Sequence, residues 1–176
     1  MSRLSPPVSP RDHAQGATRG AVTLVEYGDF ECPHCGAAYP LVKQVQEAMG
    51  AKLRLVYRHF PLTRIHTHAQ HAAEMAEAAA QHGKFWPMHD LLFENQDALD
   101  DQNLVAYAAS LGIDPEWAAA ALADGRFQRR VRDDFASGVR SGVNGTPTFF
   151  INGERYDGPW NTLLDSLTEA TINAPL

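Results

Sequence analysis

Two cysteines separated by two residues are the part of this sequence best suited to chemistry. They are Cys32 and Cys35 in the run Cys32-Pro33-His34-Cys35, and the 176-residue chain has no other cysteine. This spacing allows a tight, reversible disulfide at the start of a helix. A scaffold of structural disulfides would need several cysteines to close long loops, and a zinc site here would need two further soft or imidazole ligands.

The two cysteines are expected to differ in role. The residues before Cys32 are typical of a strand and those after it of a helix, so Cys32 falls at a helix N-terminus, where free backbone N–H groups and the helix dipole favour a thiolate. We therefore expect an exposed Cys32 to be the nucleophile and a more buried Cys35 to resolve the mixed disulfide. His34 can add positive charge near the Cys32 sulfur, which would make the pair more oxidising. The alternative is two structural thiols that merely lie close together.

Glu26 is the other candidate catalytic group. It lies inside the apolar run Val22–Tyr27, six residues before Cys32. A carboxyl group buried there should have a raised pKa and could exchange protons with Cys35. The alternative is that Glu26 reaches water at a sheet edge or pairs with Lys52 or Arg58.

The histidines do not predict a metal site. His66, His68 and His71 lie close in sequence, but no cysteine or carboxylate lies beside them at ligand spacing. We interpret them as a solvated helix start. His59, just before Phe60-Pro61, is interpreted as an ordinary loop histidine at a strand end.

Hydrophobic periodicity predicts an α/β fold. Strands are expected at 22–27, 53–60, 148–151 and 154–156, the last two joined by the turn Asn152-Gly153. One helix should follow Cys32, several more should fill 66–142, and a final helix should contain Trp160 and Leu167. The expected order is β-α-β, a block of helices, then β-β-α. This predicts one domain made of 21–65 and 143–172 with a helical insertion at 66–142, preceded by a loose N-terminal arm at 1–20.

Composition excludes several classes of protein. A formal net charge of −6 argues against a nucleic-acid partner, which would need a basic face. No apolar run approaches the roughly 18 residues of a membrane span. The first 20 residues lack the apolar stretch of a secretory signal. The expected location is therefore cytoplasmic if the sequence is complete, and periplasmic or otherwise extracytoplasmic if a signal was trimmed.

Several motifs together resemble the DsbA-like thiol–disulfide oxidoreductases of the thioredoxin superfamily. The resemblance runs from about residue 12 to 170. Its motifs are Val25-Glu26-Tyr27-Gly28-Asp29-Phe30-Glu31-Cys32-Pro33-His34-Cys35, Arg58-His59-Phe60-Pro61-Leu62, Lys84-Phe85-Trp86-Pro87-Met88-His89-Asp90-Leu91-Leu92-Phe93 and Val143-Asn144-Gly145-Thr146-Pro147-Thr148-Phe149-Phe150-Ile151-Asn152-Gly153. It implies a thioredoxin fold with an inserted helical domain.

The resemblance also implies roles for particular residues. Composition alone favours a trans bond before Pro147, whereas the resemblance implies a cis Thr146–Pro147 bond packed against the dithiol, with the Thr146 backbone offered to an extended substrate. Glu26 falls where the family keeps a buried acid, and Pro33-His34 resembles the oxidising members. The cofactor is then the redox-active disulfide Cys32–Cys35 itself.

The leading functional hypothesis is thiol–disulfide exchange, by oxidation, reduction or isomerisation of protein disulfides. The expected partners are thiol- or disulfide-containing polypeptides and a redox protein that resets the dithiol, and the chain is expected to be a monomer. One alternative is a non-catalytic redox-sensing or binding module. Another is a glutathione-dependent transferase or isomerase on the same scaffold, although those relatives typically lack a second cysteine such as Cys35.

Overall fold

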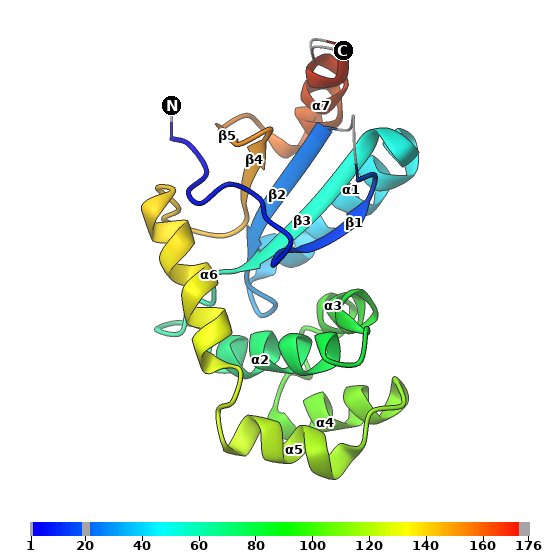
Figure 1. Cartoon of the computed structure of the whole chain (residues 1–176), viewed down its shortest axis with the longest axis vertical. Coiled ribbons are helices and arrows are strands. Elements are labelled where there is room, and N and C mark those ends of the chain that lie inside the picture. Colours follow the sequence, from blue (N-terminus) through cyan, green and yellow to red (C-terminus); the bar gives the residue numbers. More distant parts are fainter. Residues whose placement is uncertain (1, 19–21, 173–176) are drawn as a thin grey trace.

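The computed structural model describes residues 2–18 and 22–172, and its centre is a five-stranded sheet flanked by helices (Figure 1). The strands are β1 (His13–Gly16), β2 (Val22–Gly28), β3 (Leu53–His59), β4 (Thr148–Ile151) and β5 (Glu154–Tyr156). The α-helices are α1 (Pro33–Met49), α2 (Ala69–Ala80), α3 (Phe85–Glu94), α4 (Asp101–Ser110), α5 (Pro115–Ala123), α6 (Gln128–Arg140) and α7 (Leu163–Ile172). Short 3₁₀ turns at Gly50–Lys52 and Trp160–Thr162 precede β3 and α7.

The sheet has the strand order β1-β3-β2-β4-β5. β2 and β3 are parallel and are joined through α1, whereas every other pair of neighbours is antiparallel. Five helices, α2 to α6, lie between β3 and β4 in the chain. The element order from β2 onward is the predicted one, with β2 as the central strand that leads to Cys32.

The two faces of the sheet are covered by different helices because successive side chains of a strand point to opposite faces. Leu24 on β2 packs in one cluster with Val42 on α1 and Leu167 on α7. Its neighbour Val25 packs in another cluster with Phe60, against which Phe135 of α6 is stacked at 4.2 Å between ring centroids. Glu26 has the parity of Leu24 and therefore points to the side of α1.

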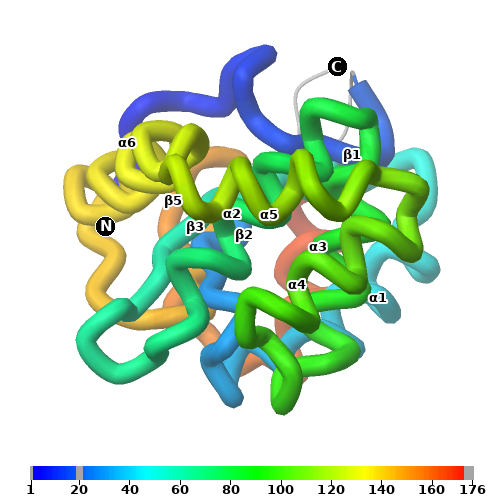
Figure 2. The backbone as a smooth tube through the Cα atoms, turned by 90° about the horizontal axis from the view of Figure 1, so that it is seen from below, coloured from blue at the N-terminus to red at the C-terminus, as the bar shows by residue number. Residues whose placement is uncertain are grey.

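The inserted helices form a second layer at one end of the sheet. α2 and α3 lie next to the sheet, α4 and α5 lie beyond them, and α6 runs back alongside it (Figure 1). Seen from below, α4 and α5 cross in front of α2 and α3 (Figure 2). The core of this layer includes Met75, Met88, Leu92 and Leu104, and it is continuous with Cys32 and Cys35. The insertion thus supplies one wall of the dithiol's surroundings.

The prediction of a loose arm at 1–20 is wrong for the described residues of that segment. β1 pairs antiparallel with β3, and Leu4 is buried. Arg58 of β3 donates hydrogen bonds of 2.7 and 3.1 Å to the Asp12 carboxylate. The strand His-Ala-Gln-Gly contains no β-branched residue and little alternation, so it pairs because β3 offers a free edge there, which the local pattern does not reveal.

Local turn and capping signals were reliable elsewhere. Asn152 and Gly153 both have positive φ, of 49° and 84°, as a tight β-hairpin requires. The Asp114 carboxylate caps α5 by accepting the Glu116 N–H at 3.0 Å. Within the described part of the chain, none of the helices has the length and apolar character to span a bilayer.

Candidate active site

The strand-to-helix connection places Cys32 at the N-terminus of α1. β2 ends at Gly28, the Cys32 N–H donates to the Asp29 carbonyl at 3.1 Å, and Cys32 is the N-cap residue with extended backbone angles. Pro33 takes the first helical position, where a missing N–H costs nothing. Both cysteines are free thiols. The prediction of an exposed Cys32 is wrong, because both cysteines are buried: Cys32 is 3% exposed and Cys35 0%.

The two cysteines differ much more in pKa than in burial. A hydrogen bond with the Cys35 side chain is the largest cause that lowers the pKa of Cys32, to about 5, although burial opposes the charge. Thr146 and the backbone N–H groups of Cys35 and His34 lower it further. Burial raises the pKa of Cys35 well above its usual range, and its hydrogen bond to Cys32 adds to that. At neutral pH the pair therefore holds one thiolate, on Cys32, and one thiol, on Cys35.

Glu26 is a buried acid beneath the dithiol. It is 3% exposed, and burial raises its pKa to about 8. Its Oε1 has no hydrogen-bond partner among the described residues, and its charge is one of the causes that raise the pKa of Cys35. The alternative of an ion pair with Arg58 is wrong, because Arg58 is bound to Asp12. A carboxyl group in this state can hold or release a proton near neutral pH.

Thr146 and Pro147 lie against the nucleophile. The Thr146–Pro147 bond is cis, as the family resemblance implied. The Cys32 Sγ lies 3.5 Å from the Thr146 carbonyl oxygen, to which it donates when it is protonated. The Thr146 hydroxyl is buried and has no partner among the described residues, so it is free to donate to a thiolate. The structure thus brings Cys32 close to Thr146, which lies 114 residues away in sequence and to which the family resemblance gave the contact with substrate.

The side chain of His34 lies on the surface, beside Trp160. His34 is exposed, and its ring meets the edge of Trp160 with 6.4 Å between centroids. Of its groups, the backbone N–H is among those that lower the pKa of Cys32. Any residue other than proline at position 34 would supply that N–H. The predicted effect of the imidazole on the pKa of Cys32 therefore needs a test of its own.

Gln96, in the loop between α3 and α4, holds the backbone of the dithiol segment. Its Nε2 donates to the carbonyls of Phe30 and Cys32, at 2.9 Å each. A Cβ on Gly36 would collide with the Gln96 side-chain oxygen, so the glycine leaves room for this contact. Sequence reasoning missed Gln96, because one polar residue in a polar loop looks like a solvated one. The glycine one residue after Cys35, within a helix, was the available signal.

Substitution of Gln96 should loosen this connection. Gln96→Ala removes the side-chain donor of the Phe30 carbonyl and one of the two donors of the Cys32 carbonyl, which keeps the Gly36 N–H at 3.0 Å. We therefore expect the free energy of unfolding to fall by about 1–3 kcal/mol. Gly36→Ala must displace the same side chain and should cost a similar amount. The double variant should then cost about as much as either single variant, since both disrupt one contact. Chemical denaturation measures all three, with Gln102→Ala on the exposed side of α4 as the control. Costs that add within about 0.5 kcal/mol would contradict the shared contact.

The three histidines set aside in the sequence do not converge. His66 Nδ1 lies 2.7 Å from Asp29, and His71 Nδ1 lies 2.6 Å from Asp101. The backbone N–H of His68 donates to Glu31 at 2.7 Å. Each acid comes from a distant part of the chain, which is why the sequence did not show it. Among the described residues, the group of three potential metal ligands that does converge is His13, His59 and Glu77, and it contains neither cysteine.

Comparisons with known proteins agree with this architecture. The family model described as Thioredoxin matches residues 8–168. BdbD from Bacillus subtilis superposes with a TM-score of 0.86 at 20% identity, covering 98% of this chain and 99% of its own. A thioredoxin-like oxidoreductase from Silicibacter pomeroyi superposes with a TM-score of 0.81 at 27% identity, covering 94% and 95%. The thiol-disulfide exchange protein alpha-DsbA2 from Wolbachia pipientis gives 0.78 at 20% identity, covering 92% and 88%. The predicted thioredoxin fold with an inserted helical domain is thereby confirmed.

Among curated sequences, the chain is similar to one part of several Na(+)/H(+) antiporters. The Na(+)/H(+) antiporter NhaA 3 of Salinispora tropica is 46% identical over 172 residues. The match covers 97% of this chain but 26% of the antiporter. The chain thus spans about a quarter of the length of the curated relatives it matches, and the antiporter's activity is not carried over to it.

Proposed function

Because this chain belongs to the thioredoxin family, we propose that its Cys32–Cys35 pair catalyses thiol–disulfide exchange and runs chiefly as an oxidant of thiol-bearing polypeptides. The family and the structural neighbours support the assignment as a thiol–disulfide oxidoreductase with a CXXC pair. The observation that carries the proposed direction is the position of Cys32 as the N-cap residue of α1, beside Cys35 and Thr146, which lowers the pKa of Cys32 to about 5. A strongly stabilised thiolate favours the reduced dithiol, and a pair that prefers to be reduced oxidises its partners.

The reaction follows from the different states of the two sulfurs. A substrate thiolate attacks Sγ of Cys32 in the disulfide, which forms a mixed disulfide and releases Cys35. Cys35 takes up a proton because burial disfavours its thiolate. A second substrate thiolate then attacks the substrate sulfur and expels Cys32 as a thiolate, a good leaving group at low pKa. The substrate loses two electrons, and the enzyme dithiol gains them.

Glu26 and Thr146 would assist these steps in different ways. Glu26, with a pKa of about 8, can give a proton to Cys35 when it leaves and accept it back when the disulfide re-forms. Thr146 would pair its backbone with an extended substrate segment and hold the substrate sulfur near Cys32. A separate redox protein must take the two electrons from the reduced dithiol to complete the cycle.

The test is turnover of a simple substrate. A reduced peptide with two cysteines is mixed with a catalytic amount of the chain and excess oxidised glutathione, and its disulfide is followed by mass spectrometry. We expect many peptides oxidised per chain, and no acceleration by Cys32→Ser. Oxidation of no more than one peptide per chain would instead favour the redox-sensing module.

Replacement of His34 measures what its imidazole contributes. We expect His34→Ser to raise the pKa of Cys32 by up to about one unit, because a side chain able to carry positive charge is lost near the helix N-terminus. The reduction potential should fall in parallel, by about 30 mV for each pKa unit. Ultraviolet titration of the thiolate and a glutathione equilibrium measure the two quantities.

The chain offers a matched control for this variant. His82 is also exposed and also meets the edge of a tryptophan, Trp117, at 4.7 Å between centroids, but it lies in the helical insertion. His82→Ser should change neither quantity. If His34→Ser also changes neither, the helix terminus and hydrogen bonds alone account for the reactivity of Cys32.

A further inference from the structure

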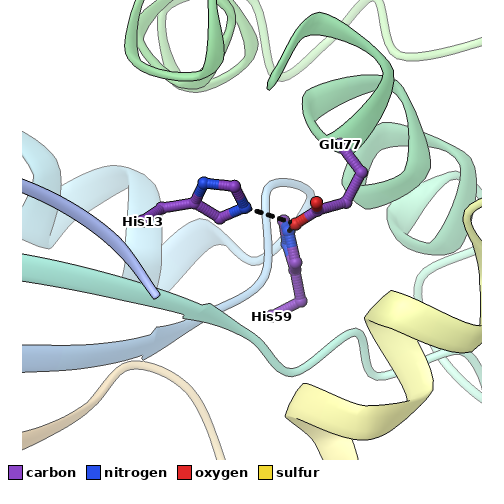
Figure 3. Close-up of side chains that lie close together, drawn as sticks. All are labelled: His13, His59 and Glu77. Carbon is purple, nitrogen blue, oxygen red and sulfur yellow. Dashed lines mark hydrogen bonds and ion pairs between the residues drawn. The ribbon is translucent and has the colours of Figure 1, made fainter. Parts of the chain in front are cut away.

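A second cluster of reactive side chains lies in a pocket that the redox mechanism does not use. The pocket has a volume of about 640 Å³ and is lined by residues that include His13, Glu77, Phe85 and Arg130. His13 comes from β1, Glu77 from α2, and the adjoining His59 from the end of β3 (Figure 3). The cluster therefore joins the sheet to the helical insertion.

The donor atoms of the three residues converge on one point. His13 Nε2 and His59 Nε2 each lie 2.7 Å from the same oxygen, Oε1 of Glu77 (Figure 3). All three ligand atoms lie within 4.8 Å of one another. A tetrahedral zinc ion with ligands at 2.0–2.2 Å places them about 3.3 Å apart. Small movements of these side chains would therefore admit an ion in place of the shared protons.

The neighbours hold these side chains in place before any ion arrives. The His13 ring is stacked on Phe85 with 3.7 Å between centroids and an interplanar angle of 6°. His59 is fully buried and its ring packs against Tyr57 at 5.6 Å. The loss of side-chain freedom on binding would therefore be small.

Glu77 and His59 are also held by contacts with Arg130 and Asp134. Arg130 Nε lies 3.9 Å from Oε2 of Glu77, the oxygen that does not face the histidines. Arg130 in turn pairs with Asp134, whose carboxylate accepts the His59 backbone N–H at 3.0 Å. The ion pair between Arg130 and Asp134 thus orients both the Glu77 carboxylate and the His59 backbone. The positive charge of Arg130 opposes a cation, so the binding should be weaker than in a site without it.

We propose that His13, His59 and Glu77 form a binding site for a zinc-class divalent cation, with one coordination position open to the pocket. Two imidazole nitrogens and one carboxylate oxygen are a ligand set that zinc uses where a fourth position is left to water or another small ligand. The ion would tie β1, β3 and α2 together. His59 Nδ1 has no partner among the described residues. Without that outer hydrogen bond the affinity should be lower by about 10–100-fold than in a fully supported site.

The experiment uses the untagged full chain, because a polyhistidine tag would bind the same ions. The background is the double variant Cys32→Ser/Cys35→Ser, since a free dithiol is itself a soft-metal ligand. The probes are Co²⁺, which reports its ligands by absorption, and Zn²⁺ in competition. We expect one Co²⁺ per chain with visible bands of low coordination number, displaced by Zn²⁺, and a rise in the unfolding temperature with Zn²⁺.

Three variants in this background decide the assignment. His13→Gln should weaken Co²⁺ binding by at least about tenfold while the chain stays folded, because His13 lies on an edge strand and is half-buried. Glu77→Gln provides a second test from another element. His71→Gln is the matched control, since His71 also pairs with a carboxylate but lies outside the cluster. Absence of saturable binding in the background, or binding that survives both His13→Gln and Glu77→Gln, would overturn the proposal.

Discussion

Cys32→Ser should reduce disulfide exchange to the uncatalysed background, whereas Cys35→Ser should trap substrates as mixed disulfides. With a pKa of about 5, Cys32 is about 99% thiolate at pH 7. Burial keeps Cys35 protonated at that pH. Without Cys32 no nucleophile remains, and without Cys35 the mixed disulfide on Cys32 has no internal thiol to release it.

The choice of replacement at Cys35 matters to this prediction. The hydrogen bond with the Cys35 side chain is the largest cause that lowers the pKa of Cys32. A serine hydroxyl can still donate that bond, whereas alanine cannot. We expect Cys35→Ser to trap substrate rapidly and Cys35→Ala more slowly, with a higher pKa at Cys32. Mass spectrometry of trapped and alkylated species gives the site and rate of each adduct. Adducts that accumulate on Cys35 of the Cys32→Ser variant would invert the assigned roles.

Glu26→Gln should change how stability depends on pH. Burial raises the pKa of Glu26 from 4.5 to about 8 in the folded protein. The folded state thus keeps a proton that the unfolded state releases. The contribution of Glu26 to the free energy of unfolding is therefore fully present below pH 4.5. It is lost as the pH rises toward 8, at about 1.4 kcal/mol per pH unit. The full loss is about 5 kcal/mol. Relative to the wild type, Glu26→Gln should gain up to that amount across this range.

Only the difference between variant and wild type is diagnostic here. The lowered pKa of Cys32 acts with the opposite sign, since its contribution is present above 9.0 and is lost as the pH falls through about 5. The two slopes oppose each other in the reduced wild type and separate only on subtraction. Denaturant unfolding of reduced protein between pH 4.5 and 8 measures the difference, with Glu47→Gln on the exposed side of α1 as the control. A difference that stays constant with pH would mean that Glu26 is not a buried acid.

The same variant should also slow the chemistry. A glutamine at position 26 cannot take up or release a proton, so Cys35 must exchange its proton with less well placed groups. We expect the rate of exchange at pH 7 to fall by about a hundredfold, as is typical when a general acid–base is lost. Stopped-flow measurement of the reoxidation of the dithiol by oxidised glutathione tests this step separately from folding.

Much of the fold could be predicted because its signals are local. The apolar runs that became β2 and β3, the Asp114 cap and the Asn152-Gly153 turn each depend on residues a few positions apart. β1 escaped prediction, because His13–Gly16 has little strand character and pairs only where the edge of β3 is available. The alternative that Arg58 pairs with Glu26 was wrong for a similar reason, because the partner of Arg58 is Asp12, which lies 46 residues away in sequence.

The residues of the candidate site likewise divide into those with a local signal in the sequence and those without one. Cys32, Cys35 and Glu26 were recognisable from spacing and from an acid inside an apolar strand. Gln96 and the cluster of His13, His59 and Glu77 were not, because their meaning arises only when the insertion packs on the sheet. One signal was present for the cluster: Glu77 is a charged residue on the buried side of an alanine-rich helix, where an acid needs partners.

The reduction potential of the Cys32–Cys35 pair tests the central claim most directly. Thioredoxin, with a nucleophile pKa of about 7, has a potential near −270 mV. A pKa of about 5 for Cys32 stabilises the thiolate by about two further units, worth about 60 mV. Equilibration of the full chain with defined ratios of reduced and oxidised glutathione, followed by acid quenching and alkylation, should therefore give a potential near −210 mV. A value at or below about −270 mV would contradict an oxidant and indicate a reductase instead.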